Sequence, residues 1–500
     1  YINVVGDYLI GGADPLLDTR KLPTPPSDQT IGDDKQPGDG PTKSSTLSKV
    51  LSLIKGPGDN MSASRRLVVM NRHTGQVLWS RSANYAFRHN AICIGGGRIY
   101  AIDRLSGDQL AKFTKKDEEP PHSYRLVAFD LKTGKEVWQA DTDIFGTWLS
   151  YSAKHDVLIE AGRVARDTIM DEPRGMRAYR AKDGKSLWHQ PTYLGPAMIH
   201  GDTILQGQGG CDLLTGALKK RVDPITGALV PWVWARNYGC NTPAASEHLL
   251  TFRSGAAGYF DLCNDGGTGN FGGFRSSCTN NLIVAGGVLT APEYTRTCTC
   301  AYQNQTSVGL IHMPEAETWT FFGTKELKGP VKRLGISFGA PGDHRAADGT
   351  LWLEYPVTPG LSPAISVTTK PAAPVTYRRH SSQVAGKWNW VGASGLKGVS
   401  EIRVVLDREP RKRTFTVRLI FAEPERVAPG ERVFNVEVQG WTMLGNLDIV
   451  KEAGGPLRTL VKEVSGVEVE DVLTVRLTPS PRASNRTTLL SGIEVIADEK

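Results

Sequence analysis

The 500-residue sequence lacks the features that mark membrane spans and nucleic-acid binding. No run approaches the roughly 20 consecutive apolar residues that a membrane-spanning helix requires. The 59 Lys and Arg residues are balanced by 52 Asp and Glu, for a formal charge of +7, and they form no long basic block of the kind that follows a phosphate backbone. We therefore expect neither a membrane span nor a nucleic-acid partner.

The start of the sequence lacks a targeting signal. The segment YINVVGDYLIGG (1–12) has no initiator Met and no basic stretch followed by an apolar one. It opens directly on an apolar strand, which a natural domain seldom does. We therefore expect a mature product or a piece of a longer polypeptide.

Cysteine is scarce, and the usual metal and haem motifs of Cys and His are absent. Six of the seven cysteines fall within ninety residues, without a Cys-x-x-Cys pair, a Cys-x-x-Cys-His haem motif or a His-Glu-x-x-His motif. The clustering favours at least two disulfides in an oxidising compartment, with Cys298 and Cys300 bonded to different partners; buried free thiols and a soft-metal site are the alternatives. The candidate disulfide cysteines are Cys211, Cys240, Cys263, Cys278, Cys298 and Cys300.

Helix-like stretches are also few, whereas the sequence contains 54 Gly and 30 Pro. This composition is typical of many short strands joined by tight turns. The length is compatible with roughly two to four domains. We expect an all-β protein.

A short pattern recurs through the first half of the chain. In each copy an alternating strand meets a Thr-Gly or Asp-Gly turn, and a second strand ends in Trp after four residues. The copies are VVMNRHTGQVLW (68–79), VAFDLKTGKEVW (127–138), RAYRAKDGKSLW (177–188) and the weaker VDPITGALVPW (222–232). Their Trp residues lie 59, 50 and 44 residues apart, close to the roughly 40–50 residues of a four-stranded propeller blade.

This pattern resembles the β-propeller repeat of quinoprotein dehydrogenases that bind pyrroloquinoline quinone. The surrounding sequence resembles propeller proteins of planctomycete-type bacteria that carry Cys-bearing loops. The segments that carry this resemblance are FRHNAICIGGGRIYAID (87–103) and GGFRSSCTNNLIVAGGVLTAPEYTRTCTCAYQNQTS (272–307). The resemblance implies a propeller over residues 65–330 and a periplasmic, cell-surface or secreted location. Eroded blades within 1–13 and 246–313, upstream chain or a protein partner would complete the ring.

The first 64 residues are expected to form a propeller strand followed by an insert rich in Pro, Gly and Asp. The insert ends in STLSKVLSLIKG (45–56), whose apolar residues share one helical face, so we expect a short helix over 47–54. Packing on the propeller rim and binding of a partner are its two interpretations.

From residue 331 the repeat disappears and strict alternation begins. Val417, Leu419 and Phe421 point to one side of a predicted strand and Arg418 to the other, as in a sheet with one wet face. The strands are expected at 413–423, 431–441, 471–480 and 489–497. Their order resembles a malectin-type domain, which implies a jelly-roll β-sandwich over 331–500 whose relatives bind glucose-containing disaccharides or form receptor ectodomains.

Aromatic residues of this second module are candidates for a sugar site. Two Trp residues in KWNWVG lie two apart, so on a strand both indoles would face the same side and offer flat surfaces to a pyranose. Glu354 and Asn389 would bind hydroxyls, and the alternative is an ordinary aromatic core. The candidate sugar-binding residues are Trp352, Tyr355, Trp388 and Trp390.

Other motifs are weak indications of chemistry. GISFG (335–339) matches a nucleophile elbow around Ser337, but no helix follows it. Asp261, Asn264 and Asp265 offer oxygen ligands for Ca²⁺ in a Gly-rich loop, although an ordinary turn explains them as well.

The sequence has no adjacent cysteines and no recognisable Trp on which a quinone cofactor would stack. We therefore expect no pyrroloquinoline quinone and no catalysis. The favoured hypothesis is a non-catalytic binding or scaffold protein with a carbohydrate or cell-surface glycan as partner. A quinoprotein-like oxidoreductase, a carbohydrate-active enzyme and a structural component of a cell-surface assembly are the alternatives.

Overall fold

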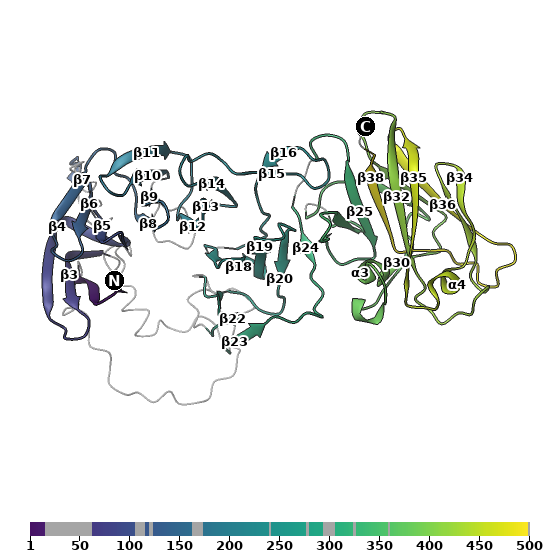
Figure 1. Cartoon of the computed structure of the whole chain (residues 1–500), viewed down its shortest axis with the longest axis horizontal. Coiled ribbons are helices and arrows are strands. Elements are labelled where there is room, and N and C mark those ends of the chain that lie inside the picture. Colours follow the sequence, from purple (N-terminus) through teal and green to yellow (C-terminus); the bar gives the residue numbers. More distant parts are fainter. Residues whose placement is uncertain are drawn as a thin grey trace. The chain divides into compact units, whose positions relative to one another are not determined.

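The structure is a computed structural model that describes residues 1–15, 63–105, 116–119, 124–162, 174–239, 242–276, 280–293, 306–323, 327–358 and 361–498. Within these ranges strands dominate, which confirms the all-β prediction. No helix among them is long and apolar enough to span a membrane. The chain divides into two compact units, Tyr1–Lys219 and Lys220–Lys500 (Figure 1). The helix expected at 47–54 lies outside the described residues.

The first unit consists of antiparallel sheets that follow one another along the chain. The long strand β4 pairs with β3 through its first half and with β5 through its second half, so one seven-stranded sheet contains two four-stranded blades. Its strands are β1 (Ile2–Val5), β2 (Tyr8–Pro15), β3 (Ala63–Asn71), β4 (Val77–Gly95), β5 (Arg98–Asp103), β6 (Arg125–Asp130) and β7 (Glu136–Ala140).

Two further sheets complete the first unit. They follow the same up-and-down order, as expected of successive blades. One contains β8 (Trp148–Ser152), β9 (Val157–Ala161), β10 (Met176–Arg180) and β11 (Lys185–Gln190), and the other contains β12 (Met198–His200), β13 (Thr203–Gln206) and β14 (Gly209–Asp212).

The recurring Trp residues connect each blade to the next. Each of the first three donates its indole N–H to a backbone carbonyl in the turn of the following blade, and its ring lies against the glycine of that turn. This contact explains why Trp and Gly recur together. The pairs are Trp79 with Leu131 at 2.9 Å, Trp138 with Ala181 at 2.9 Å and Trp188 with Leu213 at 3.0 Å.

The weaker fourth copy of the pattern lies in the second unit and has a different role. Its turn places Ile225, fully buried, in the core of the sandwich, where the Ile225 carbonyl accepts hydrogen bonds from the amides of Lys332 (2.7 Å) and Arg333 (3.0 Å). Its Trp232 donates to the Asp265 carboxylate at 3.1 Å instead of to a backbone carbonyl. The last copy therefore packs against the sandwich within the second unit.

Short sheets precede the sandwich in the second unit. They are β15 (Lys220–Val222) with β16 (Leu229–Pro231); β17 (Ala244–Ala245), β18 (Leu249–Ser254), β19 (Ala256–Asp261), β20 (Thr268–Asn270) and β24 (Thr320–Phe321); and β21 (Ile283–Ala285), β22 (Val288–Ala291) and β23 (Val308–Ile311).

Two large sheets form the sandwich. The first has the order β26 (His344–Arg345), β27 (Leu351–Tyr355), β25 (Arg333–Phe338), β38 (Gly492–Ala497), β32 (Arg413–Ala422), β35 (Thr459–Val469). The second has the order β28 (Val367–Lys370), β31 (Glu401–Val405), β36 (Val472–Pro479), β33 (Phe434–Val438), β34 (Trp441–Leu447). A smaller sheet contains β29 (Val375–Arg378), β30 (Ser394–Lys397) and β37 (Leu489–Leu490).

The facing sides of the two large sheets form one apolar core. Val417, Leu419 and Phe421 are fully buried in it, whereas Arg418 binds Glu463 and Glu494 on the other face, as the alternation predicts. Helix α4 (Ile449–Ala453) is capped by the Asp448 side chain, which accepts from the amide of Lys451. These observations confirm a propeller-type region followed by a β-sandwich.

One local prediction is wrong. Trp388 and Trp390 do not lie on a strand: Trp388 has a left-handed backbone (φ 54°) and precedes the short helix α3 (Asn389–Gly392). The helix packs closely on β35, because a Cβ atom on Gly392 would lie 2.4 Å from the side chain of Thr459. A spacing of two on this turn therefore places the indoles differently from the same spacing on a strand.

Candidate functional site

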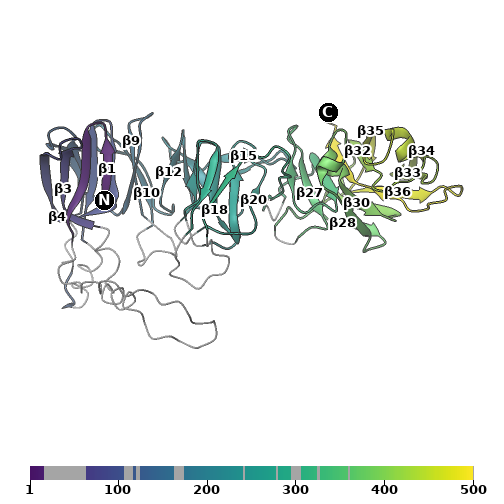
Figure 2. The same cartoon turned by 90° about the horizontal axis from the view of Figure 1, so that it is seen from below.

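The sandwich has an open groove between the edge strands of its two sheets. Strand β34 ends one sheet and β35 ends the other, and both lie on the same side of the sandwich (Figure 1, Figure 2). The groove encloses about 700 Å³. We call it the edge groove; it is lined by Lys412, Val438, Gln439, Trp441, Met443, Gly466, Val467, Glu468, Val469 and Glu470.

A tight hairpin positions the indole of Trp441 at this groove. Val438 pairs with Trp441 across a two-residue turn in which Gln439 (φ 52°) and Gly440 (φ 81°) both have positive φ, as this type of hairpin requires. The Gln439 side chain accepts from the amide of Thr474 at 2.8 Å. The Trp441 residue is nevertheless 74% exposed, an unusual state for so large an apolar residue.

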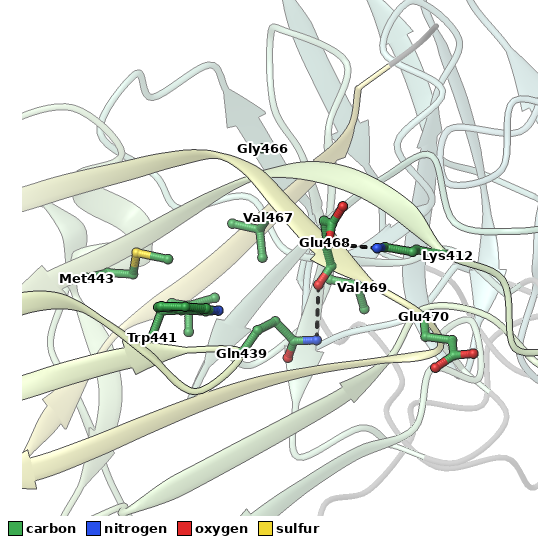
Figure 3. A pocket seen from close by; sticks show the side chains of 10 residues that line it. Lys412, Gln439, Trp441, Met443, Gly466, Val467, Glu468, Val469 and Glu470 are labelled. Atoms are coloured by element: carbon green, nitrogen blue, oxygen red, sulfur yellow. Dashed lines mark hydrogen bonds and ion pairs between the residues drawn. The ribbon is translucent and has the colours of Figure 1, made fainter.

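Figure 3 shows how the walls of the edge groove differ. The floor is apolar because it consists of the buried side chains of Val438, Val467 and Val469. The Trp441 indole stands between Met443 and Gln439, and the Gln439 side-chain amide donates to the Glu468 carbonyl at 3.4 Å. A Cβ atom on Gly466 would meet nothing within 4 Å, so this glycine leaves space.

Charged groups stand at one end of the edge groove. The Lys412 ammonium lies 2.9 Å from the Glu468 carboxylate, and both side chains are more than half exposed, so the pair contributes little to stability. The side chain of Glu470 is exposed as well. An exposed indole, an apolar floor and a few polar groups can bind a small amphipathic ligand.

The edge groove was not predicted from the sequence, although one of its walls has a recognisable sequence pattern. The hairpin VEVQGWTML (436–444) places a Trp directly after a two-residue turn on an alternating strand. Such a position has few neighbours that can cover a large side chain. The opposite wall, from Gly466 to Glu470, gives no comparable signal.

The structure brings three of the four predicted sugar-binding residues together. Trp352 is fully buried, and its ring lies 5.6 Å from the ring of Trp388 and 5.4 Å from that of Trp390. Val391 and Ile420 join the same cluster. Trp388 and Trp390 are half-buried, with Lys387 4.2 Å from the Trp388 ring centre.

Tyr355 lies apart from this cluster, against Phe338 at 5.5 Å. Of the polar groups expected to bind hydroxyls, Glu354 is buried and accepts from the Thr358 amide, and Asn389 donates to the Ser381 carbonyl. The arrangement has the contacts of a core, and sugar binding by these residues stays a prediction.

The structure describes only two of the six cysteines that we expect to form disulfides, Cys211 and Cys263. Cys93, Cys211 and Cys263 are free thiols, and burial raises the pKa of Cys211 to about 12. The Cys263 sulfur lies 3.4 Å from Nδ1 of His248. The remaining four candidates lie outside the described residues: Cys240, Cys278, Cys298 and Cys300.

The calcium candidates occupy an ordinary turn. The Asp261 carboxylate accepts from the amides of Cys263 and Asn264. The Asp265 carboxylate pairs with Arg221 at 2.8 Å and Arg345 at 3.7 Å, two cations that disfavour a third. No group of three or more His, Cys, Asp or Glu residues that could hold a metal occurs within the described ranges.

Ser337 lies on β25 and is buried. Strand β25 pairs in parallel with β27, and within the described stretch 327–358 no helix follows Ser337 as a nucleophile elbow would require. The prediction that this serine is an ordinary strand residue agrees with that position.

Two family profiles match the sequence. Residues 409–489 match the Malectin domain, and residues 52–192 match a PQQ-like repeat family described as outer membrane protein assembly factor BamB. No curated protein matches the chain. The sequence therefore carries both of the modules that its motifs indicate.

Solved structures give weaker similarities. The ANXUR2 extracellular domain from Arabidopsis thaliana is 14% identical, with a TM-score of 0.27 over 39% of this chain and 58% of that chain. A Bacteroides uniformis β-glucuronidase is 12% identical, with a TM-score of 0.29 over 53% of this chain and 29% of that chain. The chain thus spans less than two thirds of the proteins it matches.

Proposed function

Because the chain joins a PQQ-like repeat region to a malectin domain, we propose that it is an extracytoplasmic binding protein whose sandwich holds carbohydrate in the edge groove. The Malectin match supports a binding or scaffold role. The BamB description of the repeat family supports a location outside the cytoplasm. Exposure of Trp441 at the groove is the observation that carries the proposal.

The Trp441 indole is suited to bind a sugar ring. A pyranose has an apolar C–H face that packs on an aromatic ring, and its hydroxyls need polar partners at the edge of that ring. Trp441 offers the ring, and Gln439, Lys412 and Glu468 offer donors and acceptors beside it. Since Trp441 is already solvated and fixed by its hairpin, binding requires little rearrangement.

The test is titration of the full chain with oligosaccharides, after a glycan array has selected them. Trp441→Ala is expected to weaken binding by about fivefold to 160-fold, because stacking on an aromatic ring contributes about 1–3 kcal/mol. Tyr238→Ala is the matched control, since Tyr238 is 61% exposed and does not line the groove. If no glycan binds the parent chain, or if both variants bind equally well, the proposal is wrong.

A further inference from the structure

The charge of the edge groove indicates which carbohydrates it accepts. Among its ten lining residues, one Lys faces two Glu, which leaves one negative charge in excess. Lys412 and Glu468 neutralise each other at 2.9 Å. The excess charge therefore resides on Glu470.

Glu470 is free to bind a ligand. Its backbone carbonyl accepts from the amide of Arg411, which holds the residue in place, while its carboxylate has no ion-pair partner in the described part of the chain. Figure 3 shows this carboxylate beyond Gln439, on the far side from Met443. An uncompensated carboxylate in the same groove as an exposed indole attracts a cation and repels an anion.

We infer that the edge groove prefers glycans with free amino groups, such as glucosamine oligosaccharides, over neutral ones, and binds acidic glycans more weakly than neutral ones. This inference rests on the proposed function, since it specifies the ligand class of the same groove. A protonated amine of a sugar stacked on Trp441 gains an ion pair with Glu470. A uronate in the same place is repelled by the Glu470 carboxylate. Lys412 can compensate this repulsion only by breaking its ion pair with Glu468.

Solvent screening limits the size of this preference. The carboxylates of the groove are exposed, so each charge contact is screened by water and contributes roughly 0.2–1 kcal/mol. This range corresponds to a preference of about 1.4-fold to fivefold for each interacting charge. Because exposed charges are screened over about 3 Å at 1 M salt, the preference disappears at high ionic strength.

The experiment compares β-1,4-linked tetrasaccharides of glucose, glucosamine, N-acetylglucosamine and glucuronic acid. Each is titrated calorimetrically into the full chain in mildly acidic buffer, at low salt and at 1 M NaCl. We expect glucosamine to bind tightest and glucuronic acid weakest, and the differences to vanish at high salt. Glu470→Gln is expected to remove the preference for glucosamine tetrasaccharide over glucose tetrasaccharide.

The matched control is Glu315→Gln, which removes an exposed carboxylate outside the groove. It is expected to preserve the order of affinities. If the neutral tetrasaccharide binds through Trp441 but Glu470→Gln changes nothing, the charge inference fails and the proposed function stands. If none of the four tetrasaccharides binds, this inference fails, and the glycan array then decides the proposed function.

Discussion

Trp352 and Trp441 belong to the same sandwich but have opposite environments, and the sequence alone does not distinguish them. Trp352 lies on β27, the second strand of a six-stranded sheet, and is covered by helix α3, whereas Trp441 begins an edge strand. Alternation predicts one strand over 431–441 that ends at Trp441, and this prediction is wrong: the chain turns at Gln439 and Gly440, and Trp441 begins the next strand. Alternation also does not show which residues later in the chain will cover the two Trp residues.

Substitution of these two residues should therefore give different losses of stability. Trp352→Ala removes a fully buried ring and is expected to lower the free energy of unfolding by about 3–5 kcal/mol. Trp441→Ala should change it by no more than about 0.5 kcal/mol, because its ring is mostly solvated. Urea denaturation followed by circular dichroism measures both.

The same measurement tests the sugar-binding prediction for Trp388 and Trp390. Both are half-buried neighbours of Trp352. Replacing either by Ala is therefore expected to lower the free energy of unfolding, by less than Trp352→Ala does. Unchanged stability together with weakened glycan binding would instead support a role as a sugar platform.

At the scale of the element, the repeat is the part of the fold that the sequence predicts best. The Trp-to-Gly contact between successive blades repeats because every blade needs the same cover for its neighbour. The edge groove was not predictable in this way. Its two walls, β34 and β35, belong to different sheets and become neighbours only when the sandwich closes.

The contact between blades can be tested with glycines in equivalent turns. Gly184 (φ 72°) and Gly75 (φ 73°) share a left-handed backbone, so Ala at either position costs about 1–2 kcal/mol. A Cβ atom on Gly184 would also lie 2.6 Å from the Trp138 ring, whereas one on Gly75 meets nothing described within 4 Å. Thermal denaturation should show an additional loss of roughly 1–3 kcal/mol for Gly184→Ala. Equal losses in the two variants would show that the ring contact contributes nothing.

At the scale of the whole molecule, the order of the two modules follows from the sequence, but their connection does not. Motifs and alternation predict a repeat region followed by a sandwich, and the family profiles match both. The segment between them is held by groups without a motif: Ile225 in the sandwich core, and strand β24, which pairs with Asp343 through the backbone of Thr320. Such contacts depend on long-range packing, which no local pattern records.

Asp343 makes this connection sensitive to pH. Its carboxylate is fully buried and accepts from the amides of Phe322 (3.1 Å) and Glu354 (3.2 Å), one on each side of the connection. Burial raises the pKa of Asp343 from 3.8 to about 6, and the nearby Glu354 carboxylate acts in the same direction. The folded chain therefore holds this proton more tightly than the unfolded chain.

The sign of the effect follows from proton linkage. Below pH 3.8 the group is protonated in both states, and between pH 3.8 and about 6 only the unfolded chain releases the proton, so stability falls as the pH rises through this window. The expected loss is about 2–3 kcal/mol. Hydrogen exchange of the Phe322 and Glu354 amides should therefore accelerate, relative to the intrinsic rate, between about pH 4 and pH 6. Asp343→Asn should remove this dependence, and an identical pH profile in the variant would assign the effect to another group.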